Sequence, residues 1–143
     1  MENLWPENLT VTGTKAPVII LREQASLLGE ATQNIVEAEV KNASPDMGGA
    51  EENDTGFRYV FYIVAPALGN YYYKLFTIWH SVDLYPVIIR PDQDIRDELY
   101  PDADEDGIQA ESENEFIRML KAIFHSGRTG NIIQALVSQS TAP

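Results

Sequence analysis

Four carboxylate side chains are spaced in the way that calcium ligands are spaced within a short loop. Asp102, Asp104, Asp106 and Glu113 occupy positions 1, 3, 5 and 12 of the segment 102–113, and Gly107 occupies position 6. Calcium prefers oxygen ligands, and a glycine at position 6 allows the chain to turn sharply around the ion. The spacing therefore predicts a metal site for calcium at these four carboxylates.

Over these twelve residues the chain resembles the EF-hand family. The sequence departs from the family pattern at Gln109 and Ala110, where an aliphatic residue and a ligand are usual, and Pro101 directly precedes the loop. The interpretation that we favour is a solvated acidic loop that leads into a helix, because Ser112 and Glu115 form a capping box ahead of an apolar run, and a calcium site is the alternative. We therefore expect no cofactor, with calcium as the alternative.

A second group of residues has the types found in a catalytic triad. His80, Ser81 and Asp83 lie close together between two expected strands. A triad needs the base between the nucleophile and the orienting acid, whereas residues in a turn point in different directions, and Ser and Asp are common turn residues. The chain also contains no cysteine that could act as a nucleophile. We therefore expect a protein that is not an enzyme.

Aromatic side chains provide the strongest binding signal. Tyr71, Tyr73 and Trp79 lie in the strongly apolar segment 71–80, and Tyr62 lies in the preceding segment 57–65. Tyrosine and tryptophan combine a large apolar ring with a polar atom, which suits contact with a partner or a ligand. A strand that is apolar on both faces is normally covered on both faces. These four residues are therefore the predicted binding residues.

The elements that position these residues follow from the hydrophobic periodicity. Helical spacing predicts a helix from Pro17 and two further helices in the C-terminal part, and alternation predicts a strand over 34–43. Three more strands are predicted at 57–65, 71–80 and 84–90, and the short links between them require antiparallel neighbours. The predicted fold is α+β: an antiparallel four-stranded meander with an N-terminal helix and a C-terminal helical hairpin packed on one face.

The 143 residues are most simply one domain. Three segments within it lack hydrophobic periodicity: 1–13, predicted to be a loosely ordered arm; 44–56, which is rich in Gly, Asp, Asn and Glu and is predicted to be a mobile loop; and 91–111, predicted to be an acidic connector.

The formal net charge of −12 bears on the partners. Nucleic acids and anionic membrane surfaces attract clustered Lys and Arg, so neither is expected, whereas a basic protein partner is. No signal peptide or membrane-spanning run is apparent, which favours a cytoplasmic location. The leading hypothesis is a non-enzymatic protein-interaction module that acts as a homodimer. The alternatives are a small-molecule-binding domain with an aromatic pocket between sheet and helices, and calcium binding by the 102–113 loop.

Overall fold

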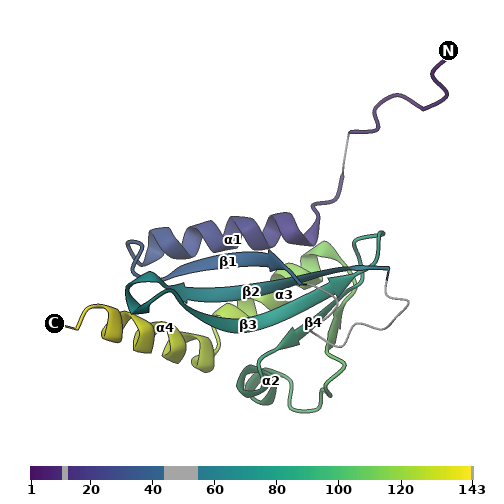
Figure 1. The fold of residues 1–143 in the computed structure, drawn as a ribbon. Coiled ribbons are helices and arrows are strands. Elements are labelled where there is room, and N and C mark those ends of the chain that lie inside the picture. The colour runs from purple at the N-terminus through teal and green to yellow at the C-terminus, as the bar shows by residue number, and fades with distance from the viewer. Residues whose placement is uncertain (11–12, 44–54, 143) are drawn as a thin grey trace.

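The helices and strands follow one another along the chain as a helix, a β-meander, and then a mainly helical C-terminal part. We use a computed structural model, which describes residues 1–10, 13–43 and 55–142. The described residues form these elements: α1 (Pro17–Ala31), β1 (Glu37–Asn42), β2 (Phe57–Ala65), the 3-10 helix η2 (Pro66–Leu68), β3 (Tyr71–His80), β4 (Val87–Pro91), α2 (Gln93–Leu99), β5 (Ile108–Ala110), α3 (Glu113–Phe124) and α4 (Gly127–Ser140). Figure 1 shows α1 running along β1. The prediction of an α+β fold with an antiparallel sheet is confirmed.

The predicted strand number is wrong by one strand. The described residues form a five-stranded sheet in the order β1-β2-β3-β4-β5, and every neighbouring pair is antiparallel. The additional strand, β5, pairs with β4 and lies inside the segment 91–111 that was predicted to be a connector. It escaped prediction because it has only three residues and is surrounded by acidic sequence, so no alternating pattern is long enough to detect.

The links between strands contain the residues that their geometry requires. Gly69 and Asn70 both have positive φ angles in the turn between β2 and β3, a conformation that Gly and Asn adopt more readily than other residues. Pro86 cannot donate a ladder hydrogen bond, and β4 begins directly after it at Val87. Pro86 thus fixes where β4 starts, although β4 is not an edge strand, because β5 lies beyond it.

Side chains cap three of the helices at their N-termini. Asp92 Oδ1 accepts from the Ile95 N–H of α2 at 2.9 Å, and Ser112 Oγ accepts from the Glu115 N–H of α3 at 3.2 Å. Ser126 Oγ accepts from the Thr129 N–H of α4 at 3.1 Å. Each cap satisfies a backbone donor that has no partner inside the helix. The predicted capping serine of α3 is confirmed.

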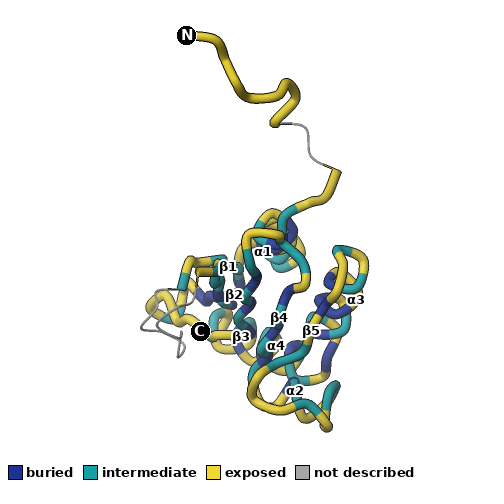
Figure 2. Tube along the Cα trace, turned by 90° about the vertical axis from the view of Figure 1, so that its right-hand side faces the viewer, coloured by how far each residue is buried: buried dark blue, intermediate teal, exposed yellow. Residues whose placement is uncertain are grey.

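The hydrophobic core lies between one face of the sheet and the helices. The strand residues in the core share one face by register, and Figure 2 shows buried segments where the sheet and the helices meet. The members from the helices are Ile20, Leu21 and Ala25 of α1, Ile95 of α2, Phe116, Met119, Leu120 and Ile123 of α3, and Ile132 and Leu136 of α4. We call the opposite side of the sheet the outward face.

The first residues of the chain project from this body. Residues 1–10 are exposed and extend away from α1 (Figures 1 and 2). The segment 44–56, predicted to be a mobile loop, falls almost wholly on residues 44–54, which lie outside the described residues.

Candidate functional site

A groove lies between α1 and the pair α3–α4. It consists of two adjoining hollows, of about 380 and 210 Å³, which share the side chains of Gln24 and Phe124. The first hollow is lined by Lys15, Ile20, Glu23, Gln24, Glu113, Ile117, Leu120, Lys121, Phe124 and His125. The second is lined by Gln24, Leu27, Leu28, Phe61, Ile63, Leu75, Phe124, Thr129 and Ile133. We call the two together the helix groove.

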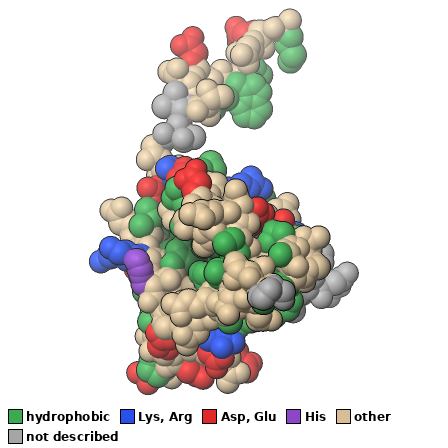
Figure 3. All heavy atoms as spheres, turned by 90° about the vertical axis from the view of Figure 1, so that its left-hand side faces the viewer, with side chains coloured by type: hydrophobic (Ala, Val, Ile, Leu, Met, Phe, Trp, Pro, Cys, Tyr) green, Lys and Arg blue, Asp and Glu red, His purple; other side chains and the backbone are tan. Residues whose placement is uncertain are grey.

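The floor of the helix groove is apolar, and its rim carries charge. Phe61, Ile63 and Leu75 of the sheet form the floor of the second hollow. Lys15 lies at the rim of the first hollow and pairs with Glu23 at 3.1 Å. Figure 3 shows hydrophobic side chains gathered across one end of the body. An apolar channel between two helices is a geometry that accepts an apolar segment of another chain.

The N-terminal arm begins at the rim of the groove. The Lys15 N–H donates to Glu113 Oε1 at 2.7 Å, and the Tyr85 hydroxyl donates to the Lys15 carbonyl at 3.0 Å. Both backbone groups of Lys15 are therefore held where the arm meets the body. Beyond this point the side chains of Leu4, Trp5 and Leu9 are 77%, 74% and 62% exposed. Three large apolar side chains on one short arm are thus left in water.

A second pocket lies between the β2–β3 hairpin and α4. It has a volume of about 560 Å³ and is lined by Leu68, Tyr71, Tyr73, Arg128, Asn131, Ile132, Ala135, Leu136 and Gln139. We call it the tyrosine pocket. Apolar walls with a few polar groups at this volume are typical of small-molecule sites.

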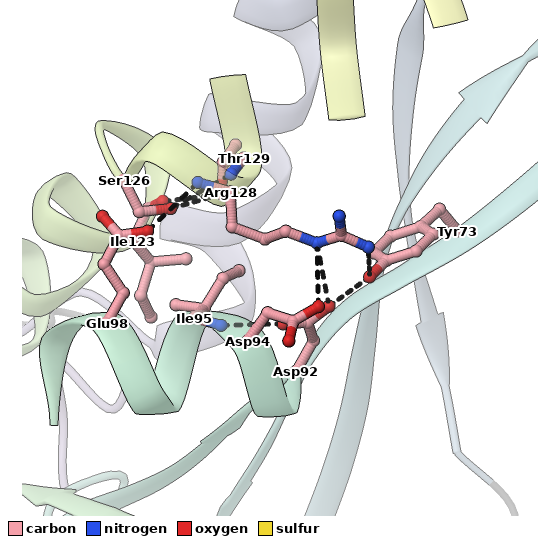
Figure 4. A network of polar contacts seen from close by, with 9 residues as sticks. All are labelled: Tyr73, Asp92, Asp94, Ile95, Glu98, Ile123, Ser126, Arg128 and Thr129. Atoms are coloured by element: carbon pink, nitrogen blue, oxygen red, sulfur yellow. Dashed lines mark hydrogen bonds and ion pairs between the residues drawn. The ribbon is translucent and has the colours of Figure 1, made fainter. Parts of the chain in front are cut away.

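A network of polar contacts closes one end of the tyrosine pocket (Figure 4). The Tyr73 hydroxyl donates to Asp92 Oδ2, and Arg128 Nη2 donates to the Tyr73 oxygen at 3.2 Å. Arg128 Nε also lies 3.3 Å from Asp94 Oδ2 and 3.9 Å from Asp92 Oδ2. The network joins β3, the start of α2 and the start of α4, so it fixes the position of the Arg128 side chain.

Burial and donation to Asp92 raise the pKa of Tyr73, although the Arg128 guanidinium acts in the opposite direction. The phenol therefore keeps its proton at neutral pH and remains a hydrogen-bond donor. Perturbed ionisable groups occur both at functional sites and in structural networks. Here the phenol hydroxyl is committed to a carboxylate that also caps a helix, which indicates a positioning role.

The start of α4 is occupied by a side chain of the protein. The sequence Gly-Arg-Thr-Gly at 127–130 is typical of a plain turn between helices, and an anion site at a helix N-terminus is the alternative. The Glu98 carboxylate accepts from the N–H of Gly127 at 2.8 Å and from the N–H of Arg128 at 3.1 Å. These donors are thus used within the protein, in agreement with the turn.

The four aromatic residues predicted for binding separate into two pairs. Tyr71 and Tyr73 line the tyrosine pocket, whereas the register places Tyr62 and Trp79 on the outward face. The reason is a β-bulge: Phe61 pairs with Phe76 and Tyr62 pairs with Lys74, so Leu75 is the extra residue in β3. One extra residue exchanges the two faces of a strand. Simple alternation, which places Tyr73 and Trp79 on one face, is therefore wrong beyond Leu75.

The structure does not gather the predicted calcium ligands into a metal site. Among the described residues, which include all four carboxylates, no group of three or more His, Asp or Glu side chains could hold a metal ion. Asp104 Oδ1 accepts from the Asp106 N–H at 2.9 Å, and Glu113 holds Lys15 instead. β5 also lies between Asp106 and Glu113 and is paired with β4.

Sequence reasoning missed several lining residues of these sites. Lys15, Gln24 and Phe124 of the helix groove come from segments far apart in the chain, and Arg128 reaches Tyr73 only through packing of α4. The amphipathic helices gave a signal for Phe124, because they predict which side faces the body.

Comparison of the chain with models of protein families, with curated proteins and with solved structures finds no match. Among the described residues, no helix has the length and apolarity needed to cross a bilayer.

Proposed function

We propose that this chain is a protein-interaction module that forms a homodimer by exchange of its N-terminal arms. In the dimer, the arm of one copy occupies the helix groove of the other. The observation that carries the proposal is the pairing of an arm whose Leu4, Trp5 and Leu9 are exposed with an apolar groove at its root. We propose no catalytic activity.

The direction of the arm favours a second copy over the arm's own body. Lys15 is held by Glu113 and Tyr85, and the arm extends away from the body (Figure 1). An extended segment spans at most about 3.3–3.6 Å per residue, so ten residues reach up to about 33–36 Å. Exchange of identical elements around a twofold axis is a common route to dimers.

The chemistry of arm and groove is complementary. Burying a Leu, Phe or similar side chain contributes roughly 1.5–3 kcal/mol, and twofold symmetry counts each contribution twice. The arm also carries Glu2 and Glu7, and Lys121 lines the first hollow, whose two acidic residues, Glu23 and Glu113, are both bound to Lys15. Acidic groups beside basic groups favour association and make it weaken with salt.

Sedimentation velocity of the full chain over a wide concentration range tests the proposal. The wild type is expected to form a dimer. The triple variant Leu4→Ser, Trp5→Ser, Leu9→Ser and the groove variant Ile117→Asp are both expected to be monomers. Val82→Ser is the matched control, because Val82 is also an exposed apolar residue but lies outside the groove, and it should leave the dimer intact.

Three outcomes would contradict the proposal. A monomeric wild type, or a dimer that survives the triple substitution, excludes arm exchange. The third outcome is a monomer in which Trp5 fluorescence is blue-shifted and in which Ile117→Asp removes the shift. This would place the arm in the groove of its own copy.

A second candidate function is small-molecule binding in the tyrosine pocket. The pocket of about 560 Å³ that contains Tyr71 and Tyr73 supports it. Native mass spectrometry of protein purified from its own cells should then show an organic adduct that Tyr71→Asp removes. An adduct that persists in this variant, or no adduct at all, would argue against the candidate.

A further inference from the structure

Strands β2–β5 place basic but no acidic side chains on the outward face, although the whole protein is acidic. The chain contains 22 acidic and 10 basic residues. By register, the outward positions of β2–β5 are Arg58, Val60, Tyr62, Val64, Tyr72, Lys74, Thr77, Trp79, Ile88, Arg90 and Gln109. Among these described positions, three are basic and none is acidic. The edge strand β1 adds Lys41 together with Glu37 and Glu39, so the acidic residues of this face lie at its edge and the part formed by β2–β5 has a local positive field.

The three cations surround one hollow. Arg58, Lys74 and Arg90 line a hollow of about 260 Å³, together with Ala43, Leu75, Phe76, Thr77, Pro91 and Asp92. Thr77 of β3 lies directly opposite Arg90 of β4, and Arg58 of β2 lies diagonally across from Thr77. Residues in these positions on one sheet face have Cβ atoms about 4.5–8 Å apart. We call this hollow the basic hollow.

The bulge at Leu75 places Lys74 in this group. Lys74 pairs with Tyr62, and the extra residue Leu75 keeps both Lys74 and Thr77 on the outward face although they are three residues apart. Among the described residues, no ion pair involves Lys74. Its ammonium group is therefore available to a ligand.

The acidic residue at the edge of the basic hollow is committed elsewhere. Asp92 Oδ1 accepts from the Ile95 N–H, and Asp92 Oδ2 accepts from the Tyr73 hydroxyl. Arg90 Nε donates to the Asp106 carbonyl at 3.1 Å, which positions its guanidinium and leaves the other N–H groups of that guanidinium for a ligand. A guanidinium presents five N–H donors in a fixed plane, which suits phosphate oxygens.

We propose that the basic hollow binds the phosphate group of a small molecule. The Lys74 ammonium group, the Arg90 guanidinium and the Thr77 hydroxyl, which line this hollow, match a dianion with several acceptor oxygens, whereas a single carboxylate would need only one guanidinium. This site lies on the face opposite the helix groove and does not depend on the proposed dimer.

Thermal unfolding of the full chain at constant ionic strength tests the site, with inorganic phosphate and pyrophosphate as probes and acetate as the carboxylate comparison. Constant ionic strength separates binding from general screening. Both phosphate probes are expected to raise the Tm of the wild type in a saturable manner, and acetate is not. Lys74→Gln and Arg90→Gln are each expected to raise the phosphate concentration that gives half of the maximal Tm shift by at least about tenfold. Each variant loses a charge-assisted hydrogen bond to the phosphate.

Lys41→Gln is the matched control. Lys41 is also on the outward face and undergoes the same charge change, but it is paired with Glu39 at 3.7 Å and lies over the Tyr72 ring rather than in the hollow. The control should bind phosphate as the wild type does. Absence of a saturable response, an equal response to acetate, or an undiminished response in Lys74→Gln would overturn the proposal. Loss of binding in Lys41→Gln alone would also overturn it.

Discussion

Replacing Phe116 by alanine is expected to lower the free energy of unfolding by about 3–5 kcal/mol. The Phe116 side chain is 0% exposed and packs edge-on against Tyr85, with ring centroids 6.3 Å apart. Its removal leaves a cavity between α3 and the sheet, which the surrounding side chains fill only in part. For a chain of 143 residues, each kcal/mol shifts the Tm by roughly 3 °C, so the expected fall is about 9–15 °C.

Ile117 provides the matched comparison on the same helix. It follows Phe116 directly but is 43% exposed, because it points into the helix groove. Ile117→Ala should therefore lower the free energy of unfolding of a single copy by about 1 kcal/mol or less. Urea titrations followed by circular dichroism, at several protein concentrations, measure both variants while accounting for dimer formation. A difference between the two variants below about 1 kcal/mol would show that Phe116 is not in the core.

Three further predictions concern single residues and the acidic loop. Gly107→Ala should lower the free energy of unfolding by about 2–5 kcal/mol in urea titrations, because its φ is +102° and a Cβ would lie 2.7 Å from the Ile89 carbonyl oxygen. Gly69 also has a positive φ but has open space around it, so Gly69→Ala should cost only about 1 kcal/mol. Burial, aided by Glu113, raises the pKa of Tyr85 to about 12, so the folded protein holds this proton more tightly than the unfolded chain. The contribution of Tyr85 to stability should be complete below pH 10 and lost as the pH rises to about 12. The Tyr85→Phe variant should lack this fall in stability, and a variant whose stability falls between pH 10 and 12 as in the wild type would contradict the prediction. The Tm should be equal in excess calcium and in chelator, and a rise with calcium would support the 102–113 loop as a metal site.

Much of the fold could be predicted because local patterns determine it. The short links at 66–70 and 81–83 require antiparallel neighbours, and the Ser112 cap places the start of α3 correctly. The three-residue strand β5 could not be predicted, since it exists only because β4 offers it a partner. Such a strand depends on tertiary contacts rather than on its own propensity.

The candidate sites were harder to predict than the fold. The bulge at Leu75 decides which aromatic residues share a face, and no residue in the sequence of β3 marks its position. For the same reason, the sequence did not indicate that Arg58, Lys74 and Arg90 surround one hollow. The net charge of the whole chain suggested a basic partner. A net charge averages over the whole surface, so it does not reveal that cations are concentrated on one part of it.

Asp92 connects the two faces of the sheet. Its carboxylate holds Tyr73 beside the tyrosine pocket, its backbone N–H donates to the Leu75 carbonyl at the bulge at 2.9 Å, and the residue also lines the basic hollow. A ligand that shifts Asp92 from one side therefore changes the energy of the contacts on the other side. Thermodynamic linkage makes such an effect reciprocal, so that each ligand would alter the affinity for the other by the same factor.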